Sequence, residues 1–154
     1  MTRFFIPILL IISTACGKPS PAEAPKPTPA ARTAADLGPM CDRYYVHQRS
    51  CVNEYLRELV QVRAEYDMPK GMTADVKDRG LDAVVADAKS EWERDTSLAK
   101  TAAICKAMAE RTPPQHVERL LADGDRCEAI TECAAFAKCA VDTERPYIQS
   151  GKMH

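Results

Sequence analysis

Apolar residues recur at steps of three, four and seven along most of the chain, a spacing that places them on one face of an α-helix. The first such stripe is formed by Tyr45, Val52, Leu56, Leu59 and Tyr66. It predicts one helix over residues 41–66, ended by the turn-forming segment "DMPKGM". A second stripe, which contains Trp92, predicts a helix over residues 81–94, with residues 73–79 as an extra turn before it. A third predicts a helix over residues 97–111.

Start and stop signals predict two more helices in the C-terminal part of the chain. Thr112 and Pro113 are typical of an N-cap and a first helical residue, and Gly124 is typical of a C-terminal cap. Asp125 then suits the N-cap of a last helix, which Pro146 is expected to end. The residues that follow this proline are expected to fray.

No segment alternates between apolar and polar residues as a half-buried strand would. Glycine is scarce, whereas alanine, leucine and the charged residues that favour helices are abundant. The sequence therefore predicts an all-α fold, a small disulfide-stapled bundle of about four to five helices after a disordered Pro/Ala-rich tether. We place this helical, cysteine-rich domain at residues 40–145 and a frayed tail at residues 146–154.

The first fifteen residues, "MTRFFIPILLIISTA", have the pattern of an export signal. Arg3 provides the positive start, and an apolar run from Phe4 to Ile12 precedes small residues. This run is much shorter than the roughly 20 apolar residues that a membrane-spanning helix needs. Residues 1–15 are therefore predicted to be a signal peptide.

The segment "STAC", which ends at Cys16, resembles the lipobox of bacterial lipoproteins, and the resemblance covers residues 1–17. In that family the cysteine thiol is diacylated, for example with palmitate, and the peptide is cut before the cysteine. Ser13 replaces the usual leucine, and an ordinary signal peptidase could cut at the same bond. The resemblance implies a protein held to the cell envelope by lipid on Cys16. Because Gly17 rather than aspartate follows, it favours the outer membrane.

The segment after Cys16, up to Pro39, holds six of the eleven prolines and almost no large apolar residue. It cannot bury a core and is expected to adopt extended polyproline-II conformations. At about 3.1 Å per residue, such a tether reaches roughly 60–70 Å. Residues 16–39 are therefore interpreted as a lipidated cysteine followed by a flexible spacer.

Seven cysteines occur in the chain, and assigning Cys16 to lipid leaves six. An even number suits disulfides in an oxidising compartment. The six disulfide candidates are Cys41, Cys51, Cys105, Cys127, Cys133 and Cys139.

The last three cysteines, in "RCEAITECAAFAKC", are six residues apart, so on one helix they point about 120° apart and rise about 9 Å per step. Such thiolates cannot converge on one zinc ion, each at about 2.3 Å, and no metal or other cofactor is predicted. They also cannot bond each other, because a disulfide needs Cα atoms about 4.4–6.8 Å apart. Each is then expected to pair with one of Cys41, Cys51 and Cys105.

An alternative pairing stays open. If the chain turns back between Tyr66 and Leu81, Cys41 lies level with Cys105. A bond between those two would require two of the last three cysteines to pair together, and only Cys127 could do so, by lying outside the last helix.

Two weaker resemblances concern the domain. The segment "CDRYYVHQRSC" has the C-x9-C spacing of the coiled-coil-helix-coiled-coil-helix proteins, which staple helical hairpins, although the chain has one such motif only. The order C-D-x-Y…C, then Trp92 and Cys105, is also similar to uncharacterised exported bacterial proteins. This second resemblance implies no activity.

Enzyme signatures such as G-x-S-x-G, H-E-x-x-H or a phosphate-binding glycine loop do not occur in the sequence. The histidines His47, His116 and His154 are expected on the solvated surface. The carboxylates that flank Trp92 are interpreted as the wet side of a helix whose tryptophan lies in the core. The tyrosines of the first helix could face a groove or a partner, although such aromatic residues are more often core.

The 21 basic and 22 acidic residues are spread evenly, so no basic stripe indicates nucleic-acid binding. We expect an envelope lipoprotein that acts by binding or scaffolding and is not an enzyme. Its expected partners are the membrane, through the lipid anchor, and an envelope protein. The alternative is a thiol-redox or metal-handling envelope protein that keeps some C-terminal thiols accessible.

Overall fold

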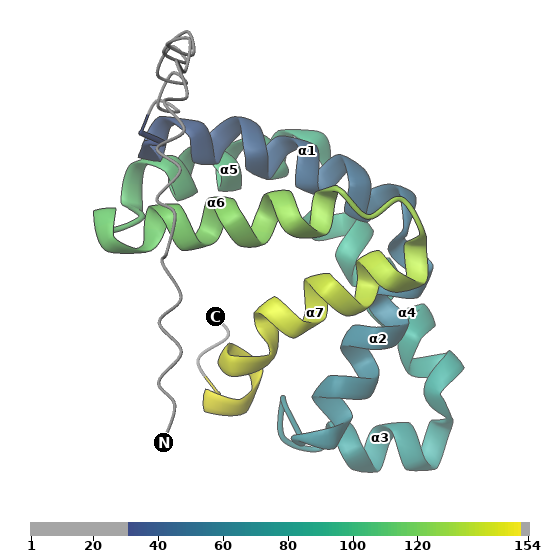
Figure 1. The fold of residues 1–154 in the computed structure, drawn as a ribbon. Helices are drawn as coiled ribbons and strands as arrows, with labels where there is room; N and C mark the ends of the chain where they lie inside the picture. The colour runs from purple at the N-terminus through teal and green to yellow at the C-terminus, as the bar shows by residue number, and fades with distance from the viewer. Residues whose placement is uncertain (1–30, 152–154) are drawn as a thin grey trace, which may run out of the picture. The chain divides into compact units, whose positions relative to one another are not determined.

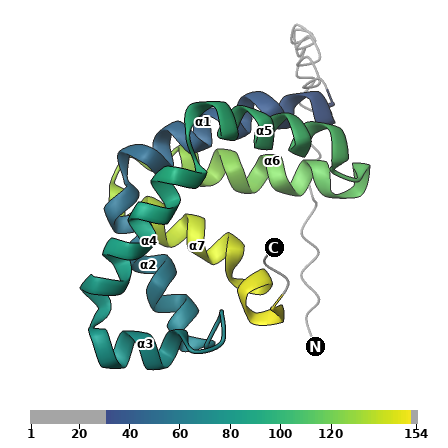
Figure 2. The ribbon, with the colours of Figure 1, turned by 180° about the vertical axis from the view of Figure 1, so that it is seen from behind.

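A computed structural model describes residues 31–151, which form an all-α bundle without any β-strand in that range (Figures 1 and 2). This confirms the predicted fold class, although the described residues form seven α-helices and not four or five. The elements are η1 (Ala34–Asp36), a 3-10 helix, and α1 (Leu37–Ser50), α2 (Val52–Glu65), α3 (Met72–Arg79), α4 (Leu81–Asp95), α5 (Leu98–Arg111), α6 (Pro114–Glu128) and α7 (Cys133–Ser150). The signal peptide and Cys16 lie outside the described residues.

The helices form two layers. In the first layer, α1 packs between α5 and α6, and η1 contacts all three. In the second layer, α2 packs between α4 and α7, and α3 closes the far end against α2 and α4. The chain passes between the layers at the α1–α2 junction, the α4–α5 junction and the α6–α7 junction. None of these helices is long and apolar enough to cross a bilayer.

The predicted single helix over residues 41–66 is wrong, because it breaks at Cys51 into α1 and α2. The φ of −112° and ψ of 25° at Cys51 interrupt the helical backbone. The break has a tertiary reason: α1 packs on α5 and α6, whereas α2 must turn to pack on α4 and α7. The helices predicted at residues 81–94 and 97–111 are confirmed as α4 and α5, and the extra turn expected at residues 73–79 is a separate short helix, α3.

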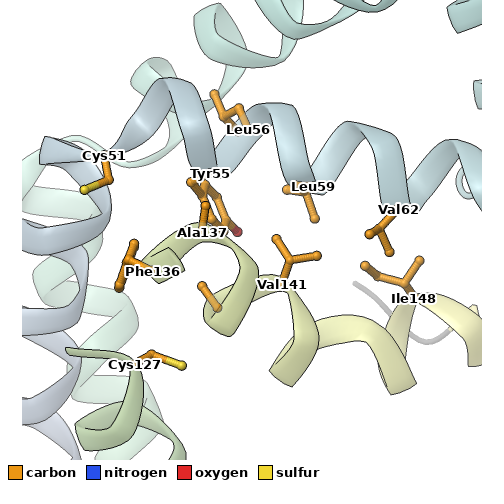
Figure 3. Packing of buried hydrophobic residues seen from close by; sticks show 11 residues of the cluster. Cys51, Tyr55, Leu56, Leu59, Val62, Cys127, Phe136, Ala137, Val141 and Ile148 are labelled. Atoms are coloured by element: carbon orange, nitrogen blue, oxygen red, sulfur yellow. The ribbon is translucent and has the colours of Figure 1, made fainter. Parts of the chain in front are cut away.

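The second layer contains the larger hydrophobic core, which lies between α2 and α7 (Figure 3). Leu59 and Val62 of α2 face Val141 and Ile148 of α7 along this interface. Phe136 at the start of α7 is fully buried and extends the contact to α1. The core therefore continues from the α2–α7 interface to the place where the two layers meet.

The first layer has a smaller core, formed by Leu37, Met40, Val117 and Leu121. Leu37 is completely buried, so the helical domain begins before residue 40 and the predicted linker is too long at its C-terminal end. A salt bridge of 2.7 Å between Arg32 and Asp125 also holds this start against α6.

The boundaries of the last two helices differ from the prediction. Helix α6 begins at Pro114, one residue later than expected, and runs through Gly124 to Glu128. Gly124 lies inside the helix and serves packing, because a Cβ there would collide with the side chain of Met40. The predicted stop at Gly124 and the N-cap at Asp125 are therefore wrong.

Helix α7 begins after a short turn, and its N-cap is Glu132, whose carboxylate accepts the backbone N–H groups of Ala134 and Ala135 at 3.0 and 2.7 Å. The helix then continues through Pro146 to Ser150, so the predicted end at this proline and the frayed tail are wrong as far as residue 151. Burial of Ile148 explains the continuation, because its side chain completes the core against α2.

Candidate functional site

The six cysteines of the domain form three disulfides, which confirms their assignment as disulfide residues. The bonded pairs are Cys41–Cys105, Cys51–Cys133 and Cys127–Cys139. The expectation that each of the last three pairs with one of the first three is wrong for Cys127–Cys139. The alternative with Cys41–Cys105 is the one observed, because the turn between α6 and α7 places Cys127 on a different helix from Cys139.

Two of the disulfides lie where the layers meet. Cys51, at the α1–α2 break, bonds Cys133 at the first residue of α7, and so links two of the junctions between layers. Cys127 near the end of α6 bonds Cys139 in α7 across the turn between these helices. These bonds restrict the angle between the layers, whereas Cys41–Cys105 joins α1 to α5 within the first layer.

A groove of about 880 Å³ lies between the layers and is lined mainly by α1, α2, α4, α6 and α7. Its volume falls in the range of about 300–1,000 Å³ that is usual for ligand sites. Apolar side chains such as Leu56, Leu59 and Leu120 contribute to its walls. Its aromatic lining residues are Tyr44, Tyr45, Tyr55, Trp92 and Tyr147.

The most unusual polar group of the groove is Glu144 of α7. It is half-buried, and the Tyr55 hydroxyl donates a hydrogen bond of 3.0 Å to its Oε1. Burial raises the pKa of Glu144, while the hydrogen bond from Tyr55 and the charge of Arg63 act in the opposite direction. The pKa of Tyr55 is also raised, first by burial and then by the neighbouring charge of Glu144.

Arg63 of α2 also lines the groove. Its Nε is buried, and it is the single buried side-chain nitrogen or oxygen of the described residues that lacks a hydrogen-bond partner. A buried donor without an acceptor is costly, so this atom marks a place where the fold alone does not satisfy its polar groups.

Several other charged groups at the groove have partners on the surface. Arg126 pairs with Asp123 at 3.0 Å, and Arg119 donates to the hydroxyl of Tyr147 at 2.8 Å. Asp142 pairs with Lys138 at 3.5 Å and with Arg145 at 3.4 Å. Among the ion pairs of residues 31–151, Glu144 takes part in none.

Among the described residues, the histidines, Trp92 and its acidic neighbours do not gather in one site. His47 is not a solvated surface residue, because its ring stacks on Phe136 with centroids 4.1 Å apart. His116 is exposed as expected, and His154 lies outside the described residues. Trp92 is half-buried against the core, with the guanidinium carbon of Arg49 5.1 Å from its ring centroid. The acidic residues that flank Trp92 are exposed, which confirms that they lie on the solvent-facing side of that helix.

Sequence reasoning missed Glu144 and Arg63, although each left a signal. Glu144 follows Ala137 and Val141 at helical spacing and precedes Ile148, so a carboxylate occupies a position of the buried stripe. Arg63 continues the stripe of α2 in the same way. The predicted helix end at Pro146 hid the first signal, because it left Ile148 outside the helix.

No protein-family model, curated protein or solved structure matches this chain. Within the part of the chain that the structure describes, no group of three or more His, Cys, Asp or Glu side chains is arranged to hold a metal ion.

Proposed function

We propose that this protein is a lipid-anchored envelope lipoprotein whose helical domain binds a partner protein in the groove between its two layers. The observation that carries the proposal is the lining of the groove, which combines several tyrosines and a tryptophan with arginines. Tyrosine, tryptophan and arginine are the residue types that most often dominate the binding energy of protein interfaces. Apolar walls beside them provide surface that a partner would remove from water.

The disulfides support a binding role over a thiol-redox one. A protein that exchanges electrons or holds a metal through these cysteines needs accessible thiols, whereas all six cysteines of residues 31–151 are paired. Two of the three bonds lie at the junctions of the layers, where they hold the groove in one shape. A groove fixed before binding loses less conformational entropy when the partner enters.

The lipid anchor and the tether belong to the same proposal. Acylation at Cys16 would keep the domain in the envelope, since each buried CH₂ contributes about 0.8 kcal/mol to membrane binding. The spacer then allows the groove to reach a partner away from the bilayer. Replacing the cysteine, Cys16→Ser, is expected to release the protein from the membrane fraction. Undiminished membrane attachment of this variant would contradict the anchor.

Site-specific photo-cross-linking in the native envelope tests the groove. A photoreactive phenylalanine analogue replaces Tyr45, which lines the groove, or its neighbour Val46, which is 66% exposed and does not line it. We expect a discrete cross-linked protein from position 45 and none from position 46. Equal cross-linking from both positions, or none from either, would overturn the groove as the binding site.

A further inference from the structure

We propose that the partner inserts a lysine or arginine side chain into the groove and that its cation pairs with Glu144. This inference rests on the proposed function and names the chemistry of the group that the groove recognises. It starts from a carboxylate whose surroundings in the fold leave it incompletely paired.

Glu144 has one neutral hydrogen-bond donor and an open second oxygen. Tyr55 donates to Oε1, and Oε2 accepts no hydrogen bond from the residues that the structure describes. A half-buried carboxylate loses part of its hydration, and a single neutral hydrogen bond does not replace it. An incoming ammonium or guanidinium group supplies the missing charge and donors together, as a charge-assisted hydrogen bond.

The surroundings of Glu144 suit a long side chain with a cation at its tip. Tyr44 and Tyr45 of α1 and Tyr55 of α2 line the groove, and all three lie close enough for the charge of Glu144 to raise their pKa values, after the larger effect of burial. Lysine and arginine have apolar stems that pack along such rings while the charged end reaches a carboxylate. Rings around the path also attract the cation itself.

Among the groove carboxylates of the described residues, Glu144 is the one that is both unpaired and sheltered from solvent. Asp95, Asp123 and Asp142 have the cationic partners Lys100, Arg126 and Lys138. Glu91 forms no ion pair but is exposed, so water can hydrate it. Arg63 is the one opposing charge near Glu144, and it forms no ion pair with Glu144 within 4.0 Å. The guanidinium of Arg63 can donate a hydrogen bond to a main-chain carbonyl of the same partner. Such a carbonyl lies next to any side chain that the partner inserts.

Three blocked hexapeptides that differ at one central position test the inference. The position carries lysine, its uncharged analogue norleucine, or glutamate, with leucines on either side for the apolar walls. Each is titrated into the full mature protein, and binding is followed by NMR shifts of the groove residues. We expect the lysine peptide to bind about tenfold or more tightly than the norleucine peptide, because a desolvated charge pair is lost.

Glu144→Gln is the decisive variant, and Glu118→Gln is its matched control. Glutamine at position 144 keeps an acceptor for Tyr55 but removes the charge, whereas Glu118 is exposed on α6 and does not line the groove. The lysine preference should disappear in Glu144→Gln and persist in Glu118→Gln. In the wild type it should weaken at acid pH, as Glu144 becomes protonated.

Any other outcome of these titrations would contradict a specific part of the inference. Equal affinities of the lysine and norleucine peptides, or an unchanged preference in Glu144→Gln, would remove the cation from the inference. If butylamine binds as tightly as the lysine peptide, the ligand of the groove is a free amine and not a polypeptide side chain. If the peptides show no preference while position 45 still cross-links, the inference fails and the proposed function stands. If the lysine peptide binds but no protein is cross-linked from position 45, the proposal that a protein partner occupies the groove is contradicted instead.

Discussion

The two layers of the domain are stabilised in different ways. The second layer has nine buried core residues on α2 and α7, to which Cys51 and Cys127 add at the junctions with the first layer, whereas the core of the first layer contains four. The first layer instead has a disulfide of its own, Cys41–Cys105, and a close approach of Met40 to Gly124. The difference shows that one small domain can combine a layer held by apolar burial with a layer held by a covalent bond and small residues.

The groove lies between these differently stabilised layers, and Phe136 connects them. This residue belongs to the core of the second layer, and its ring meets those of Tyr44 and His47 on α1 at centroid distances of 5.6 and 4.1 Å. Tyr44 in turn lines the groove. The shape of the groove therefore depends on packing at the contact between the layers as well as on the disulfides.

The largest loss of stability is expected when Phe136 is truncated to alanine. Removing a fully buried aromatic ring costs about 3–5 kcal/mol, because the cavity collapses only in part. Chemical unfolding with urea measures the change in the free energy of unfolding. Val46→Ala, at an exposed position, should leave it nearly unchanged. A loss below about 1 kcal/mol for Phe136→Ala would show that this residue does not join the layers as described.

Removing the disulfide of the first layer comes next. The double variant Cys41→Ser with Cys105→Ser opens a loop of sequence separation 64 and should cost about 2–4 kcal/mol. Hydrogen exchange should accelerate most in α1 and α5, because the smaller core cannot hold them as firmly. Equal acceleration in α2 and α7 would contradict the separate stabilisation of the layers.

A smaller effect is expected at the close helix contact of the first layer. Gly124→Ala places a Cβ in collision with the buried side chain of Met40, and this overpacking should cost about 1–3 kcal/mol. In the control Gly38→Ala, the new Cβ meets Ala109 at an ordinary 3.9 Å, and stability should change by less than about 1 kcal/mol. Thermal unfolding of both variants measures the difference, and a stabilised Gly124→Ala would show that Met40 moves aside freely.

The smallest effect concerns pH. The pKa of Glu144 is raised by burial in the folded protein, so folding favours the protonated carboxyl. The resulting stabilisation is complete below the pKa of the unfolded chain and is lost as pH rises through the raised pKa of the folded protein. Relative to Glu144→Gln, the wild type should therefore become less stable between acid and neutral pH. Urea unfolding at several pH values measures this, and parallel curves would contradict burial of the charge.

Much of the fold was predictable because local patterns carry it. The apolar stripes that predicted α4 and α5 each lie within a single helix, and their spacing is the one that any packing partner would require. The boundaries failed where a neighbour in space decides the outcome. Gly124 carries the signal of a helix end but serves as a contact surface for Met40, and Pro146 continues a helix whose Ile148 is buried against α2.

The candidate site was less predictable than the helices. Tyr44, Tyr45 and Tyr55 were recognised as residues that could face a groove, but the sequence did not indicate that they surround Glu144. A charged residue in a buried stripe can be recognised within one helix. Its partners come from other helices, and their positions depend on the angle between the layers.

The sequence by itself determined the helical class, the disulfide role of six cysteines and the positions of several helices, because composition, cysteine number and periodicity act locally. Only the tertiary structure decided the break at Cys51, the pairing of Cys127 with Cys139 and the groove between the layers. Each of these depends on which distant helices meet and at what angle. The helices adopt the arrangement that buries all their apolar faces together, and no single segment of the sequence determines that arrangement.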